Sequence, residues 1–113
     1  MKILIVDDNA SMRRLIKTVL SDFHAEFVEC ADGGKALENY RLNKPDIVLM
    51  DIMMPEVDGL EATRRIRAAF PDARVVVVTY YDDPDLRKAA TSVGAAGYVL
   101  KEDLSQLRAF CVQ

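Results

Sequence analysis

The stretch PDIVLMDIMMPEVDG, at residues 45–59, places a carboxylate, Asp51, where a short aliphatic run stops. A continuous apolar run of four residues between turn signals is typical of a strand that is covered on both faces. In an open parallel sheet, ligands bind outside the carboxyl ends of the strands. The stretch therefore predicts a buried parallel strand with Asp51 at a ligand site.

Three further aliphatic runs end in polar residues in the same way. Asp7 and Asp8 follow residues 3–6, Thr79 follows residues 75–78, and Lys101 follows residues 98–100. Three carboxylates that lie close together repel one another unless a cation lies between them. The sequence therefore predicts one polar site, built from four strands, that holds a hard divalent metal ion.

Hydrophobic periodicity divides the chain into alternating strands and helices. We expect strands at residues 2–6, 26–30, 46–50, 74–78 and 97–100, the second of which carries charges like an edge strand. Helical patterns cover Met12, Leu15, Ile16, Val19, Leu20 and Phe23; Ala36, Leu37 and Tyr40; Leu60, Thr63, Ile66 and Phe70; Leu86, Ala89, Ala90 and Val93; and Leu104, Leu107 and Phe110. This alternation predicts a doubly wound α/β domain with a five-stranded parallel sheet and helices on both faces. Periodicity does not give the strand order.

Composition restricts the class of protein. The 113 residues suffice for one domain, and a net charge of −3 argues against direct nucleic-acid binding. No apolar run approaches the ~20 residues of a membrane span. The first residues are too short an apolar run for a signal peptide, so we expect a cytoplasmic protein without a membrane partner.

Each polar residue also has a plain structural explanation when it is taken alone. Asp8 could be a helix cap, Asp51 could open a turn, and Thr79 is a good strand residue. Lys101 could be a solvated surface charge. The joint pattern favours the site, because independent caps and turns have no reason to be acidic at the first and third strand ends and cationic at the last.

The order and spacing of these residues resemble the receiver domain of bacterial two-component response regulators, including the chemotaxis receivers. The matching segments are Val6-Asp7-Asp8-Asn9, residues 45–55, Asp58-Gly59, Thr79, Gly94-Ala95, Gly97-Tyr98 and Lys101. The resemblance covers essentially the whole chain and implies one receiver domain at residues 1–113. It also implies a flavodoxin-like fold with strand order 2-1-3-4-5, which is one of the common orders of doubly wound sheets.

The resemblance implies a role for each site residue. Asp51 matches the phosphoacceptor, which takes a phosphoryl group from a sensor histidine kinase or phosphotransfer protein. Asp7, Asp8, Asp51 and the backbone carbonyl of Met53 match the ligands of Mg²⁺, which Mn²⁺ could replace. Thr79 and Lys101 match the hydroxyl and the ammonium that contact the phosphoryl group. Such a domain is not a separate enzyme, since it catalyses only its own phosphorylation and slow dephosphorylation.

The resemblance also implies a switch. Thr79 and Tyr98 match the residues that transmit phosphorylation to the surface of the fourth helix, fifth strand and fifth helix. That surface would contact an output domain, a target protein or a second copy in a homodimer. Without the resemblance, the sequence would favour Tyr98 as an ordinary half-buried aromatic residue of a strand, with no role in switching.

Two features depart from the family pattern. Receivers usually carry a small residue after the switch hydroxyl, whereas Tyr80 stands here, and together with Tyr81 and Met53 it is expected to narrow access and slow phosphoryl exchange. The fifth helix is short, so we expect Leu107 and Phe110 to be partly exposed or to pack in a dimer. The chain is either a stand-alone receiver or a piece of a regulator with a DNA-binding domain.

Three other functions are compatible with parts of this sequence pattern. In the first, Tyr80 disables the chemistry and the chain is a phosphorylation-independent interaction domain, a pseudo-receiver. A flavodoxin-type nucleotide binder would need a donor-rich loop where Asp7 and Asp8 stand. A small-molecule phosphatase would need a second lobe to enclose its substrate.

Overall fold

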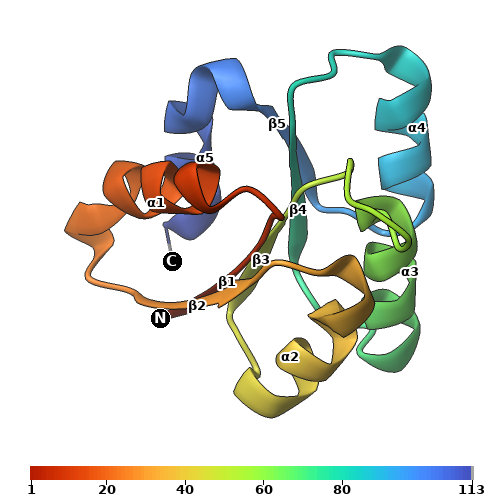
Figure 1. Ribbon diagram of the computed structural model, residues 1–113, viewed down its shortest axis with the longest axis horizontal. Helices are drawn as coiled ribbons and strands as arrows, with labels where there is room; N and C mark the ends of the chain where they lie inside the picture. Colours follow the sequence, from red (N-terminus) through yellow and green to blue (C-terminus); the bar gives the residue numbers. More distant parts are fainter. Residues whose placement is uncertain (113) are drawn as a thin grey trace.

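The computed structural model describes residues 1–112 and contains one five-stranded parallel sheet. The strands are β1 (Lys2–Val6), β2 (Glu26–Cys30), β3 (Ile47–Met50), β4 (Val75–Thr79) and β5 (Gly97–Leu100). Their order across the sheet is β2-β1-β3-β4-β5, and all four pairings are parallel (Figure 1). The expected doubly wound fold and strand order are confirmed.

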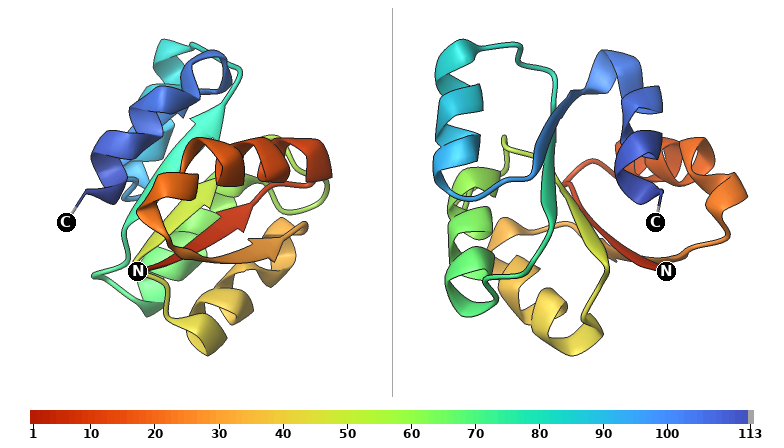
Figure 2. Two further views of the ribbon diagram at one scale, coloured as in Figure 1. Left: turned by 90° about the vertical axis from the view of Figure 1, so that its left-hand side faces the viewer. Right: turned by 180° about the vertical axis from the view of Figure 1, so that it is seen from behind.

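Helices cover both faces of the sheet (Figure 2). The α-helices are α1 (Ala10–Val19), α2 (Ala36–Asn43), α3 (Gly59–Ala69), α4 (Pro84–Ser92) and α5 (Leu107–Cys111), and a 3-10 segment, η3 (Lys101–Gln106), leads into α5. One core contains Ile3 and Ile5 of β1 with Ile16 of α1 and Leu107 of α5. The alternate residues of β1 face a second core beneath α2 and α3, as expected for a strand covered on both sides.

Two strands differ from their expected bounds, because β3 begins one residue later and β4 is shifted by one residue at both ends. Asp46 precedes β3, and its carboxylate accepts a hydrogen bond from the backbone N–H of Lys2 at 2.6 Å. Thr79 is the last residue of β4 and pairs with Leu100 of β5. The sheet therefore fixes the backbone of Thr79, which the sequence analysis placed just beyond the strand.

Two expectations about apolar residues were wrong. Leu15 is 47% exposed, although it belongs to the predicted apolar stripe of α1. Successive helical residues are about 100° apart, so the helix buries Met12 and Ile16 and leaves Leu15 at the edge of the stripe. Leu107 is fully buried in the first core and not exposed, whereas Phe110 is partly buried, with its ring against Gly97. Within residues 1–112, no helix has both the length and the apolar content needed to cross a membrane.

Candidate functional site

The ends of β1 and β3 place two carboxylates side by side. Val6 and Met50 are paired in the sheet, and the N–H of Asp51 donates to the carbonyl of Val6 at 2.9 Å. The N–H of Asp7 donates in turn to the carbonyl of Cys30 at 3.0 Å. The parallel hydrogen-bonding pattern thus continues one residue past the strands and fixes the backbone of both acids.

A tight loop after Asp51 holds the start of α3 against the site. A side chain at Gly59 would place its Cβ 1.8 Å from the carbonyl oxygen of Asp51, so only glycine fits there. Asp58 caps α3 by accepting the N–H of Glu61 at 2.9 Å. The Asp-Gly pair at residues 58–59 therefore closes the loop and packs it onto the backbone of Asp51.

The structure gathers the predicted acids and the predicted lysine. Asp7, Asp8 and Asp51 each present a carboxylate oxygen within 4.8 Å of the others. Lys101 Nζ lies 2.9 Å from Asp7 Oδ2 and 3.3 Å from Asp51 Oδ1. Asp7, Asp51 and the side chain of Lys101 are buried, whereas Asp8 is exposed. Asn9, not Asp8, caps α1, so the capping explanation does not account for Asp8.

The site contains more negative than positive charge. Burial, followed by the nearby charge of Asp7, raises the pKa of Asp51 despite the opposing effect of Lys101. Burial would lower the pKa of Lys101, but the hydrogen bond and charge of Asp7, together with Asp51, raise it. Lys101 thus stays an ammonium, and a single ammonium faces three carboxyl groups.

The donor set fits a hard divalent cation. Asp7 Oδ1 accepts the N–H of Asn9 at 2.8 Å, and the buried Oδ2 lies 2.9 Å from the Lys101 ammonium. Three carboxylate groups that each present an oxygen to the same place are the kind of oxygen ligands that Mg²⁺ takes. The excess negative charge supports the same conclusion.

The backbone of Tyr81 connects Thr79 to Tyr98. The N–H of Tyr81 donates to the buried hydroxyl of Thr79 at 3.3 Å, and the carbonyl of Tyr81 accepts from the Tyr98 hydroxyl at 2.6 Å. Thr79 and Tyr98 are thereby joined through one residue of the loop between β4 and α4. The resemblance predicted switch roles for Thr79 and Tyr98 and an access role for Tyr81, but not that the backbone of Tyr81 links the two switch residues.

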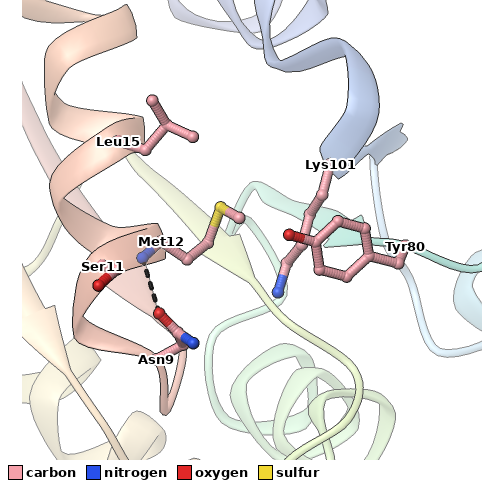
Figure 3. A pocket seen from close by; sticks show the side chains of 6 residues that line it. All are labelled: Asn9, Ser11, Met12, Leu15, Tyr80 and Lys101. Atoms are coloured by element: carbon pink, nitrogen blue, oxygen red, sulfur yellow. Dashed lines mark hydrogen bonds between the residues drawn. The ribbon is translucent and has the colours of Figure 1, made fainter.

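A cavity of about 240 Å³ lies at the edge of the site. It is lined by Asn9, Ser11, Met12, Leu15, Tyr80 and Lys101, with side chains of α1 on one side and Tyr80 and Lys101 on the other (Figure 3). Lys101 Nζ lies 5.1 Å from the centre of the Tyr80 ring, which is itself exposed. Tyr81 and Met53 are also exposed but do not line this cavity. The α1 residues of the cavity are not predicted by the sequence pattern, because the apolar stripe assigns Met12 and Leu15 to the core.

Similarity to known proteins shows the family to which the chain belongs. The family model described as the response regulator receiver domain matches residues 3–111. The chain belongs to this family. It is therefore a receiver domain of the two-component response regulators, as the sequence resemblance indicated.

Individual relatives agree with this assignment. The chain is 40% identical over 102 residues to the chemotaxis protein CheY of Listeria monocytogenes, covering 89% of this chain and 86% of that protein. It is 39% identical over 104 residues to the transcriptional regulatory protein DegU of Brevibacillus brevis, covering 89% of this chain but 44% of that protein. The chain thus matches nearly all of one relative and less than half the length of another.

A solved structure matches the whole fold of the receiver. The BeF₃-activated N-terminal receiver domain of RstA from Klebsiella pneumoniae superimposes with a TM-score of 0.88 at 30% identity. The match covers 100% of both chains.

Proposed function

We propose that this receiver is phosphorylated on Asp51 by a sensor histidine kinase or a phosphotransfer protein. The observation that carries the proposal is the meeting of Asp7, Asp8, Asp51 and Lys101 at one edge of the sheet. In the reaction, an Asp51 carboxylate oxygen forms a bond to phosphorus while the bond from phosphorus to the histidine nitrogen breaks. The product is an acyl phosphate, and the histidine leaves as a neutral imidazole once it has taken a proton.

The other residues neutralise charge and position the phosphoryl group. Asp7, Asp8, Asp51 and the backbone carbonyl of Met53 would hold Mg²⁺, or Mn²⁺ in its place, which when bound supplies positive charge to the phosphoryl oxygens. Lys101 already lies 3.3 Å from Asp51 and would neutralise another oxygen. The buried hydroxyl of Thr79 would donate a hydrogen bond to a third.

The proposed output is a change in the surface of α4, β5 and α5. Phosphorylation adds about −1.5 to −2 charges to one side chain. Thr79 would move toward these charges, and the backbone N–H and carbonyl of Tyr81 would transmit that movement to Tyr98. The altered surface would contact an output domain, a target protein or a second copy of the chain. On this proposal residues 1–113 act as one receiver unit.

An intact-mass experiment tests the phosphoacceptor. The chain is incubated with Mg²⁺ and acetyl phosphate or phosphoramidate, and its mass is measured with and without the Asp51→Asn substitution. We expect one phosphoryl adduct on the wild type, no adduct on Asp51→Asn, and the wild-type adduct on Asp72→Asn, which alters an exposed acid away from the site. An adduct that persists on Asp51→Asn would overturn the assignment.

One observation favours the alternative, a phosphorylation-independent interaction domain. The Tyr80 ring lies over the Lys101 ammonium and borders the cavity beside it. If the ring blocks the site, neither small phosphodonors nor beryllofluoride will bind to the wild type. Tyr80→Ala would then restore the adduct, whereas a pseudo-receiver with further defects would stay inert.

A further inference from the structure

The output side of Tyr98 carries a contact that the proposed reaction does not use. The guanidinium carbon of Arg87, on α4, lies 4.5 Å from the centre of the Tyr98 ring, on β5. Two nitrogens of the same guanidinium lie 3.1 Å from Asp82 Oδ1, in the loop between β4 and α4. Arg87 therefore joins the helix, the strand and the loop at one point.

Tyr98 is held from three directions. Its hydroxyl donates to the carbonyl of Tyr81, and one face of its ring lies under the guanidinium of Arg87. The ring also packs beside the cluster of Ile52, Val77 and Ala90. Ile52 directly follows Asp51, so this cluster connects the ring to the backbone of the phosphoacceptor.

We propose that Arg87, anchored by Asp82, is a positioning residue that holds the ring of Tyr98 against the Tyr81 carbonyl. A cation over a tyrosine face stabilises that ring position, and the planar guanidinium can stack and pair at the same time, which an ammonium cannot do as well. Because the N–H of Tyr81 donates a hydrogen bond to the hydroxyl of Thr79, the clamp also orders the loop that follows this hydroxyl. The link to phosphorylation rests on the function proposed above.

Fluorine NMR tests the clamp without any phosphoryl chemistry. The chain contains four tyrosines, so incorporation of 3-fluorotyrosine gives four resonances that single Tyr→Phe variants assign. We expect Arg87→Met to shift or broaden the Tyr98 resonance and Asp82→Asn to do so to a smaller extent. Lys88→Met, which removes the neighbouring exposed cation of α4, should leave the resonance unchanged. An unchanged Tyr98 resonance in Arg87→Met overturns the clamp.

Beryllofluoride binding tests the coupling to the site. With Mg²⁺ present, Arg87→Met should weaken beryllofluoride binding about two- to fivefold, the range of an exposed cation–π contact, and Arg87→Lys should fall between it and the wild type. If Arg87→Met alters the Tyr98 resonance but binds beryllofluoride as the wild type does, the coupling is refuted. If the wild type itself does not bind beryllofluoride, the proposed function fails, and the fluorine resonances still decide the clamp independently.

Discussion

Replacing Lys101 with methionine should destabilise the chain in the absence of divalent metal. The ammonium lies 2.9 Å and 3.3 Å from two carboxylate oxygens, and at an effective dielectric of about 20 each contact contributes roughly 5 kcal/mol before desolvation is subtracted. Removing one partner of a buried ion pair costs about 3–5 kcal/mol. Asp8 is exposed in the same cluster, so water reaches the site, and we expect a loss of about 2–3 kcal/mol.

Urea denaturation with and without Mg²⁺ measures this effect. Lys17→Met is the matched control, because Lys17 pairs with Glu29 at 2.9 Å on the surface, where such a pair contributes about 0–1 kcal/mol. Thermal melts should show a drop of roughly 10 °C for Lys101→Met. Saturating Mg²⁺ should stabilise this variant more than the wild type, since it enters a site with one more net negative charge. A Lys101→Met midpoint equal to that of Lys17→Met, or no extra gain from Mg²⁺, would refute the reasoning.

The remaining predictions concern Tyr80, which borders the site, and Arg108, on α5. Tyr80→Ala should speed both phosphorylation and dephosphorylation severalfold by uncovering Lys101, whereas Tyr80→Phe should stay close to the wild type. If a quench assay finds the same rates for Tyr80→Ala and the wild type, the Tyr80 ring does not cover the site. Arg108→Met should loosen α5 and increase its backbone hydrogen exchange, because Arg108 makes two 2.6 Å hydrogen bonds to Asp22 beyond α1. The control Arg41→Met, which removes a salt bridge within α2, should increase hydrogen exchange less. The hydrogen bonds to Arg108 lower the pKa of Asp22 from 3.8 to about 2. The stability that this contact adds to the fold is therefore complete above the pKa of Asp22 in the unfolded chain, and it is lost as the pH falls through the pKa of Asp22 in the folded chain. Urea titrations should therefore show a weaker loss of stability over this range in Arg108→Met, and an unchanged acid profile would count against the contact.

The sequence predicted the architecture because buried parallel strands have a distinctive pattern. Each run of aliphatic residues, such as residues 47–50, is short and bounded by polar residues, and the structure places all five strands within one residue of their expected bounds. The strand order came from the family resemblance, since apolar periodicity is the same for any order. The positions of Asp7, Asp51 and Lys101 followed from a single geometric rule about strand ends.

Contacts between side chains of distant segments could not be predicted in this way. Arg87 lies over Tyr98, and Tyr80 lies over Lys101, because of the course of the loop between β4 and α4. Periodicity assigns a residue to a face of a helix but does not say what the neighbouring element covers. Leu15 illustrates this, because the same stripe that buries Ile16 leaves Leu15 beside the cavity.

The electrostatics of the site connect its construction to its proposed chemistry. Parallel strands bring Asp7 and Asp51 together through backbone hydrogen bonds, which form whether or not the side chains repel. Burial, followed by the charge of Asp7, raises the pKa of Asp51, so folding without a divalent cation stores unfavourable free energy at that carboxylate. A cation that binds there would recover the part of this free energy that comes from repulsion between the carboxylates. Lys101 relieves only part of the repulsion, because one ammonium faces three carboxyl groups, and the residual negative charge would favour a doubly charged ion over a singly charged one.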